Sequence, residues 1–459
     1  MIHENAWNTY SAEDLKKLEK LGADYIAFLN NGKTERECTE LIVAMAKEHG
    51  YKDLAGVIEK GEKLTKGDKV YAVNMDKMVM LFNIGEDIVG GGMNIIGSHI
   101  DSPRLDIKQN PLYESGDLAF LDTHYYGGIK KYQYVTLPLA LHGVVVKPDG
   151  TKIKISIGEK DDEPVFIISD LLVHLAGEQM KKPVAEAVTG ENLDILVGCK
   201  PLKGKEKEAV KEAVLNALKD EYGIEEADFI SAELEAVPAG KAREAGFDRS
   251  MIVGYGQDDR SCAFSALTAL MEVSAPKTTA CGLFVDKEEI GSFGATSMSS
   301  RFFEYMLREV LDRLGVYSEL NLSRCLRNSR MISSDVSSAY DPLYSDRFEK
   351  KNASILGHGL AIHKYSGTRG KSGSNDTNAE YLGQIRQILD KHGVVYQTSE
   401  LGKVDGGGGG TIAKILAQYG MQVVDCGVAI LSMHAPWETL CKADLYETMK
   451  GYRAFLIEA

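Results

Sequence analysis

The sequence predicts an α/β fold with more than one domain, and three observations support this prediction. The chain has 459 residues, more than the roughly 250–300 residues at which a single hydrophobic core stops growing. Several apolar runs with β character end in polar residues, as strands do at the carboxyl edge of a buried parallel sheet. Between these runs, apolar residues recur at helical spacing.

The N-terminal part alternates predicted helices and strands. Residues 11–31 and 34–49 carry Leu, Ile, Phe and Met at helical spacing between charged residues. Strand-like VYAVNM and KMVMLFNIG follow, and then the glycine-rich GGGMNIIGSHID. The last of these runs predicts a buried strand with polar residues at its end.

The chain changes character between residues 112 and 247. YVTLPLALHGVVVK and TKIKISIGE flank Pro148-Asp149-Gly150, which predicts a β-hairpin. PVFIIS and ADFISAELEAV add β character around a charged helix in residues 203–223. Its charges are typical of a solvent-exposed helix face with ion pairs four residues apart. The alternative is that this face binds a partner.

The α/β alternation resumes near residue 255 with the helical run SCAFSALTALMEVS. Polar strand ends lie on both sides of the β-rich middle. We therefore expect one discontinuous domain, residues 1–111 and 248–459, interrupted by an inserted domain of residues 112–247.

Charge and composition argue against two classes of partner. The formal net charge is −14, whereas sequence-independent binding of nucleic acid needs an excess of Lys and Arg. No stretch approaches the ~18–20 apolar residues of a membrane span, and the start of the chain lacks signal-peptide features. The seven scattered cysteines form no C-x-x-C pair, which indicates a reduced, cytoplasmic location.

Five strand–loop junctions carry the candidate chemistry, in MNIIGSHID, GYGQDD, CGLFVDKEE, MISSD and VVDCGVAILSMH. Sites in open α/β sheets form at the carboxyl edge of the strands. Two histidines with several carboxylates suit a pair of Zn²⁺-like ions better than Ca²⁺ or Mg²⁺, which favour all-oxygen shells. The pattern therefore predicts a two-metal hydrolase site formed by His99, Asp101, Asp258, Glu288, Glu289, Asp335 and His434.

Each junction has a structural alternative when it is taken alone. His99 would be a satisfied histidine near a strand end, and Glu288-Glu289 would be a solvated acidic turn. However, a carboxylate at Asp101 suits the second N–H of a metal-bound imidazole. A buried pair of like charges is unfavourable unless a cation neutralises it. Neighbouring side chains also diverge at a strand end, so that one glutamate can bind metal while the other faces the attacking water.

The glycine run Gly406–Gly410 has two interpretations. Five consecutive glycines are tolerable only in a loop because they lose so much backbone entropy on folding. The run is either a flexible surface loop or a loop whose amides approach a substrate. In the second case, a helix starting near Thr411 would present an N-terminus that favours anions.

Six motifs together resemble one family. They are SHIDSPRLDIKQNPLYE, HYYGGIKKYQ, GYGQDDR, DKEEIGS, SSDVSSAYDP and GVAILSMHAPWE, in the family's order over nearly the whole chain. The chain resembles the aspartyl aminopeptidases, cytoplasmic dizinc exopeptidases that assemble as tetrahedral particles. The resemblance implies a mixed-sheet zinc-peptidase catalytic domain and a β-rich inserted dimerisation domain. It also implies removal of N-terminal residues, acidic ones in that family, from short peptides, with dimers that build a dodecamer.

The resemblance implies a role for every residue at the junctions. Two divalent ions per chain are expected, Zn²⁺ first, with Co²⁺ and Mn²⁺ as alternatives. His99 and Asp335 would bind one ion, Glu289 and His434 the other, and Asp258 both, while Glu288 would be the general base and Asp101 would orient His99.

The chain departs from the family pattern at two places. Many members have Asp-Asn at Asp258-Asp259, and Asp-x-Ala-His where this chain has Asp335-Val336-Ser337-Ser338. With these departures, the chain resembles a bacterial branch of the family. The acidic substrate preference therefore carries over less safely than the chemistry.

Two further regions bear on substrate and assembly. His174, in LLVHLAGEQ, is either packed in a helix of the insert or, as the resemblance implies, reaches a neighbouring subunit's site and stabilises the tetrahedral intermediate there. The loop HKYSGTRGKSGSND is either solvated or binds an acidic side chain through cations, of which His363 and Lys364 are expected before Arg369 and Lys371.

Two other functions are alternatives for the same sequence features. A dizinc deacylase or carboxypeptidase acting on N-acyl amino acids would share the ligand set, and it would be inactive on free-amine peptides. A non-enzymatic self-assembling shell protein would bear lost ligands, whereas every ligand position is filled here.

Overall fold

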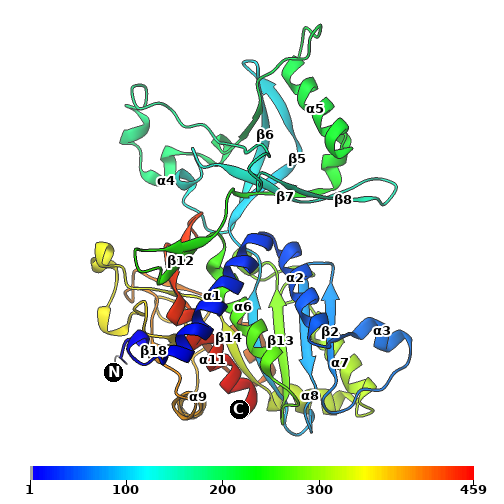
Figure 1. The fold of residues 1–459 in the computed structure, drawn as a ribbon, viewed down its shortest axis with the longest axis vertical. Helices are drawn as coiled ribbons and strands as arrows, with labels where there is room; N and C mark the ends of the chain where they lie inside the picture. The colour runs from blue at the N-terminus through cyan, green and yellow to red at the C-terminus, as the bar shows by residue number, and fades with distance from the viewer. Residues whose placement is uncertain (1–3) are drawn as a thin grey trace. The chain divides into compact units, whose positions relative to one another are not determined.

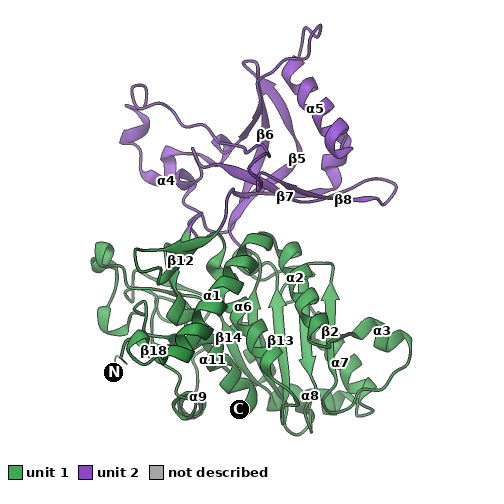
Figure 2. Ribbon diagram, in the orientation of Figure 1, with its two compact units in different colours: residues 1–101, 242–433, 438–459 green, residues 102–241, 434–437 purple. Residues whose placement is uncertain are grey.

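The computed structural model describes residues 4–459, and these residues form two compact units (Figures 1 and 2). Residues 1–3, at the start of the segment that lacks signal-peptide features, lie outside the described residues. Unit 1 runs to Asp101 and also contains Ala242–Met433 and Glu438–Ala459, while unit 2 contains Ser102–Lys241 and His434–Trp437.

Both borders of the expected insert differ from the borders of unit 2. The expected border after residue 111 falls inside strand β5 (Arg104–Ser115). That strand pairs with other strands of unit 2, so it belongs to that unit along its whole length. The return to unit 1 at Ala242 precedes the expected residue 248 because β11 (Arg243–Ala245) already pairs with a strand of unit 1.

Unit 1 is built on a mixed sheet of nine strands in the order β1-β2-β3-β13-β4-β14-β20-β16-β18. Four central neighbours, β13, β4, β14 and β20, are parallel, whereas β3 and β16 pair antiparallel at either side of them. This architecture confirms the expected α/β mixed-sheet fold. The strands are β1 (Lys52–Asp53), β2 (Lys69–Asn74), β3 (Met78–Asn83), β4 (Met93–His99), β13 (Thr279–Val285), β14 (Arg330–Ser334), β16 (Leu360–His363), β18 (Tyr396–Thr398) and β20 (Gln422–Gly427).

Helices cover both faces of this sheet because side chains alternate between the faces along each strand. In β4, Ile95 packs into one core and Ile96 into the other. The first core includes residues of α3, α7, α8 and α10, and the second includes residues of α1, α2, α6, α9 and α11 (Figure 1). These helices are α1 (Ala12–Asn31), α2 (Glu35–Glu48), α3 (Leu54–Glu59), α6 (Gln257–Glu272), α7 (Phe302–Arg313), α8 (Glu319–Asn328), α9 (Ala379–Lys391), α10 (Ala413–Leu416) and α11 (Lys442–Glu458).

The first two helices begin where the sequence predicts. The Ser11 hydroxyl accepts the N–H of Asp14, and the Asp14 carboxylate accepts the N–H of Ser11 in return, which forms a capping box before α1. Thr34 caps α2 through the N–H of Glu37 in the same way. No helix among residues 4–459 is long and apolar enough to cross a membrane.

A second, smaller sheet of unit 1 has the order β11-β12-β22-β21-β15. It matters for the site because β12 leads into the start of α6, which carries Asp258. Besides β11, its strands are β12 (Met251–Gly254), β15 (Ser337–Ser338), β21 (Ala429–Leu431) and β22 (Glu438–Cys441).

Unit 2 is a six-stranded sheet in the order β8-β7-β10-β5-β6-β9. β7 and β8 pair antiparallel on either side of Pro148–Gly150, which confirms the predicted hairpin. The charged helix starts at Ala209 and not at residue 203. Besides β5, the elements are β6 (Leu118–Tyr126), β7 (Leu139–Val146), β8 (Lys152–Ile157), β9 (Ile195–Gly198), β10 (Ala232–Pro238), α4 (Val184–Ala187) and α5 (Ala209–Tyr222).

The glycine run is held by backbone pairing. Gly408–Gly409 forms β19, which pairs with β17 (Gly367–Thr368). A Cβ atom at Gly408 would overlap the carbonyl oxygen of Gly367, and its φ of 123° also disfavours other residues. The helix that follows, α10, has only four residues. Close backbone contact therefore accounts for this glycine, and the expected helix near Thr411 is too short to present an anion site.

Candidate active site

The predicted polar residues of unit 1 gather at one edge of its large sheet. His99 is the last residue of β4, Asp335 directly follows β14, and Glu288 with Glu289 lies in a 3₁₀ turn (Glu288–Ile290) just after β13. Because β13, β4 and β14 are parallel neighbours, their carboxyl ends lie side by side. Asp258 reaches this edge from the start of α6.

His99 and Asp258 are central to the geometry. The Nε2 atom of His99 lies 3.2 Å from Oδ1 of Asp258 and 3.8 Å from Oδ1 of Asp335. Three sets of potential ligand atoms lie within 4.8 Å of one another. The sets are His99 with Asp258 and Glu289, His99 with Glu288 and Asp335, and Asp258 with Asp259 and Asp335.

Asp101 holds two parts of this arrangement together. Its Oδ1 lies 3.3 Å from Nδ1 of His99, and the Asp101 carbonyl oxygen lies 3.0 Å from the same nitrogen. A proton on Nδ1 satisfies both oxygens and leaves Nε2 free to bind a cation. The Asp101 carboxylate also accepts the backbone N–H groups of Glu288 and Glu289, each at 3.2 Å. The sequence predicted only the contact with His99.

The electrostatics of the site favour a bound cation. Burial, and then the charge of Asp258, raises the pKa of Asp335 well above its ordinary value. Burial, and then the charge of Asp335, does the same to the pKa of Asp259. Burial opposes charge on His99, but its hydrogen bonds with Asp101 and Asp258 raise its pKa well above the ordinary value. The carboxylates thus resist being ionised together, and a cation bound beside them would remove that penalty.

Asp259 is not among the metal ligands that the sequence predicts. It is fully buried, and its Oδ2 accepts the backbone N–H of His99 at 3.3 Å. Its Oδ1 has no hydrogen-bond partner among the described residues. An unpartnered buried carboxylate oxygen beside a histidine and other carboxylates fits a divalent transition ion. The adjacent letters Asp258-Asp259 were the only sequence signal for it.

His434 does not belong to any of the three sets found among the described residues. It lies in the segment His434–Trp437, which groups with unit 2. Its Nδ1 lies 2.9 Å from the carbonyl oxygen of Gly128. A backbone carbonyl on one ring nitrogen is the usual support of a metal-bound histidine, because it fixes the tautomer and leaves the other nitrogen available.

His174 lies in a turn and not in a helix, so the expectation that it is packed in a helix is wrong. The side chain is exposed. The surrounding Leu172, Val173 and Leu175 are also exposed, by 54%, 68% and 68%. The segment is irregular, so these apolar side chains have no core to enter.

The loop that the sequence predicts to be cationic offers less positive charge than its residues suggest. His363 ends β16, is buried, and has a pKa that burial lowers to about 4. Its ring is therefore neutral at pH 7. The Nζ atoms of Lys364 and Lys371 lie 3.9 Å and 2.8 Å from the Asp376 carboxylate, so both cations have a nearby counter-ion.

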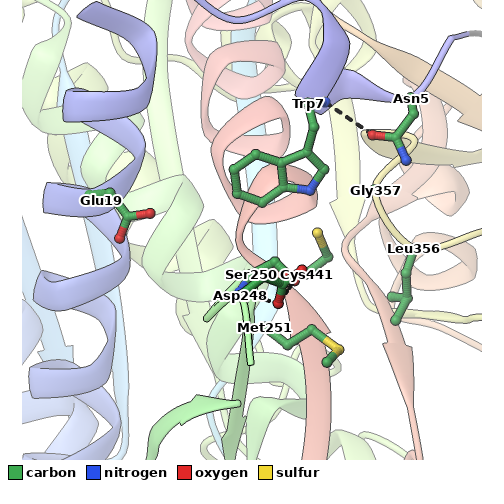
Figure 3. A pocket seen from close by; sticks show the side chains of 9 residues that line it. All are labelled: Asn5, Trp7, Glu19, Asp248, Ser250, Met251, Leu356, Gly357 and Cys441. Atoms are coloured by element: carbon green, nitrogen blue, oxygen red, sulfur yellow. Dashed lines mark hydrogen bonds between the residues drawn. The ribbon is translucent and has the colours of Figure 1, made fainter. Parts of the chain in front are cut away.

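A separate pocket of about 400 Å³ in unit 1 contains none of the predicted site residues (Figure 3). Its walls include Trp7, Met251 and Leu356. Two carboxylates line the pocket, and both have partners: Glu19 pairs with Nζ of Lys442 at 2.6 Å, and Asp248 accepts the backbone N–H and the hydroxyl of Ser250. The pocket therefore does not compete with the sheet edge as the candidate active site.

Comparisons with known proteins identify the family of the chain. The family model described as aminopeptidase I zinc metalloprotease (M18) matches residues 28–456. A probable M18 family aminopeptidase 1 of Clostridium acetobutylicum is 55% identical over 455 residues, covering 99% of this chain and 98% of that protein. An aspartyl aminopeptidase 1 of Schizosaccharomyces pombe is 27% identical and covers 90% of this chain and 89% of its own.

Solved structures give the same result. The crystal structure of an M18 aminopeptidase from Thermotoga maritima has a TM-score of 0.96 and 45% identity and covers 100% of both chains. The mApe1 dodecamer of S. cerevisiae, at 19% identity, a TM-score of 0.74 and coverage of 95% and 96%, shares the fold. These matches confirm the resemblance seen in the motifs. The chain belongs to the M18 family of zinc metalloprotease aminopeptidases.

Proposed function

We propose that this aminopeptidase uses two metal ions at the sheet edge to remove N-terminal residues from short peptides. The observation that carries the proposal is that ligand atoms of His99 lie within 4.8 Å of those of Asp258 and Glu289 in one set, and of those of Glu288 and Asp335 in another. A site of this composition, with two histidines once His434 is included, suits Zn²⁺, with Co²⁺ or Mn²⁺ as alternatives.

We assign His99 and Asp335 to one ion and Glu289 and His434 to the other, with Asp258 shared. Asp258 belongs to a set with Glu289 and to another with Asp335, which supports the shared role. Metal ions bound there would polarise the scissile carbonyl and acidify the attacking water.

Glu288 is assigned as the general base. Its carboxylate lies in a set with His99 and Asp335, so it is at the site without belonging to the proposed ligands. It takes a proton from the attacking water and delivers it to the leaving amine, so that the amine departs neutral. Asp101 keeps Glu288 and Glu289 in place by accepting their backbone N–H groups.

For the first residue of the substrate, we propose an acidic side chain that is bound at the loop after β16. Lys364 is the proposed cation, because its 3.9 Å contact with Asp376 is long enough for a substrate carboxylate to replace it. His363, which is neutral at pH 7, would contribute a hydrogen bond and not a charge. The rates at which Lys364→Met hydrolyses Asp-p-nitroanilide and Leu-p-nitroanilide distinguish this assignment from a preference for neutral first residues.

We further propose that unit 2 mediates self-association into dimers that build a dodecamer. The support is a stretch of exposed apolar side chains that a monomer would leave in water. A second copy covering this stretch would bring His174 into an interface, where it would act in the neighbour's site. The stretch contains Val165, Ile167, Leu171, Leu172, Val173, Leu175, Met180 and Val184.

The cysteines support a location in the reducing cytoplasm. All seven cysteines are free thiols, and only Cys199 is exposed. An oxidising compartment would favour pairing of cysteines, whereas a reducing one keeps them as thiols.

The test of the metal site combines metal analysis with activity. We expect up to two transition ions per chain, loss of Leu- or Asp-p-nitroanilide hydrolysis after chelation, and recovery on adding Zn²⁺. His99→Ala should lose metal, whereas His142→Ala, which removes another buried histidine, should keep it. Activity that survives a strong chelator in metal-free protein would contradict the proposal. Cleavage of N-acetylated substrates with no activity on free amines would favour the deacylase alternative.

A further inference from the structure

A buried glutamate outside the proposed ligand set holds the loop that carries Asp258. Glu438 is the first residue of β22 and is 1% exposed. Its Oε2 accepts the backbone N–H of Gln257 at 2.7 Å and that of Asp258 at 3.1 Å. One carboxylate oxygen therefore fixes two consecutive peptide groups where the chain passes from β12 into α6.

The same glutamate also fixes the side chain of Gln257. The Gln257 amide nitrogen donates to the Glu438 carbonyl oxygen at 2.6 Å and to that of Ile252 at 3.2 Å. The Gln257 amide oxygen accepts the Tyr25 hydroxyl at 3.3 Å. In addition, Glu438 pairs with Gly254 in the β12–β22 ladder. The loop is thus attached to β22 before, at and after Gln257.

This attachment replaces bonds that a helix would otherwise supply. Asp258 and Asp259 have non-helical backbone angles, with ψ of 107° and 24°, although they lie within the span of α6. N–H groups at a helix start need partners from outside the helix. Without Glu438, the Gln257 and Asp258 N–H groups would lose their acceptor in a buried site, where an unpaired N–H is unfavourable.

The attachment also opposes a repulsion. Ligand atoms of Asp258, Asp259 and Asp335 lie within 4.8 Å of one another, and like charges at that separation push the loops apart. We propose that Glu438 is a positioning residue that holds Asp258 at the distance from His99 and Asp335 that shared metal binding requires. This inference rests on the proposed metal site and adds to it a residue that touches neither metal nor substrate.

The test compares three variants by their affinity for Zn²⁺, measured by competition with a chromophoric chelator. Glu438→Leu removes the acceptor, and we expect the Kd for Zn²⁺ to rise 10–100-fold, the usual effect of losing a group that supports a ligand. Glu438→Gln keeps an acceptor oxygen and should stay within about threefold of the parent. Asp444→Leu is the matched control, because Asp444 is fully buried and accepts the N–H groups of Gly357 and Gly359 away from the site.

A second measurement separates positioning from general stability. In metal-free protein, amide hydrogen exchange of a peptide spanning residues 255–262 should be faster in Glu438→Leu than in Asp444→Leu. Should Glu438→Leu fail to fold, Gln257→Ala replaces it, with an expected rise of several-fold in the Kd for Zn²⁺. The inference is overturned if the parent binds Zn²⁺ and the folded variant binds it equally well. It is also overturned if Asp444→Leu weakens binding as much. A parent that binds no Zn²⁺ would reject the proposed function itself.

Discussion

Exchanging one carboxylate for an amide at two neighbouring positions separates proton transfer from metal binding. Glu288→Gln and Glu289→Gln differ by one position and have the same change in size and charge. Neither change removes the contact with Asp101, which accepts the backbone N–H groups and not the side chains. The local backbone should therefore survive in both variants, and any difference between them reports on the two side chains.

The expected magnitudes follow from the assigned roles. General acid–base transfer is typically worth 10²–10⁴-fold, which corresponds to about 2.7–5.4 kcal/mol of activation free energy. Glu288→Gln should lower kcat by that factor and keep the metal content of the parent. Glu289→Gln removes a proposed ligand from the set with His99 and Asp258, so its metal content should fall at a chelator concentration that the parent withstands.

The assay is kcat and KM on an aminoacyl-p-nitroanilide, with metal counted in the same samples by elemental analysis. Because an effect on kcat with KM unchanged locates the loss in the transition state, both constants are needed. If Glu288→Gln were nearly fully active, the assignment of the base would be wrong. If instead Glu288→Gln lost metal while Glu289→Gln kept it, the two glutamates would have to exchange roles.

Three further outcomes are expected. Burial keeps the folded-state pKa of His363 at about 4, below its ordinary value of 6.5. The neutral His363 ring therefore contributes fully to stability above pH 6.5, and this contribution is lost as the pH falls. Between pH 7 and 5, the free energy of unfolding of the metal-free parent should fall by about 2 kcal/mol more than that of His363→Leu. Mixing inactive Glu288→Gln with inactive His174→Ala should restore some activity if His174 serves a neighbour's site, and no recovery after proven subunit exchange would reject that idea. Gly408→Ala should lower Tm more than Gly406→Ala, because a Cβ at Gly408 meets backbone whereas the nearest atom at Gly406 is 3.9 Å away, and equal Tm values would contradict this reason.

The strand ends were predictable because burial leaves a simple signal in the sequence. β4 and β13 are buried along their whole length, and both were seen as apolar runs followed by His99 and by Glu288-Glu289. The fold class follows from the same signal, since such strands require helices on both faces of the sheet. Polar residues that end a short apolar β run are therefore the site residues that a sequence locates best.

Contacts between distant segments left no such signal. Asp101 accepts N–H groups 187 and 188 residues away, and no periodicity in one segment reports a partner in another. The glycine run gave no more information, because Gly408 is needed for the pairing of β19 with β17, in which it lies opposite Thr368, and only the folded backbone reveals this pairing. The segment around His174 could have been a packed helix by its sequence, but it is an exposed turn with no core to pack against.

Two carboxylates near the site act on the backbone and not as proposed ligands, and the physical reason is the same for both. Ligands at a sheet edge lie on loops, whose N–H groups have no partner in a strand or helix ladder. Asp101 supplies acceptors for the turn after β13, and Glu438 supplies one for the non-helical start of α6. Both add negative charge close to a crowded acidic centre, which is unfavourable until a cation binds. The acceptors that hold the ligand segments therefore also strengthen the attraction for metal. A neutral acceptor, as in Glu438→Gln, should preserve the geometry while slightly lowering that attraction.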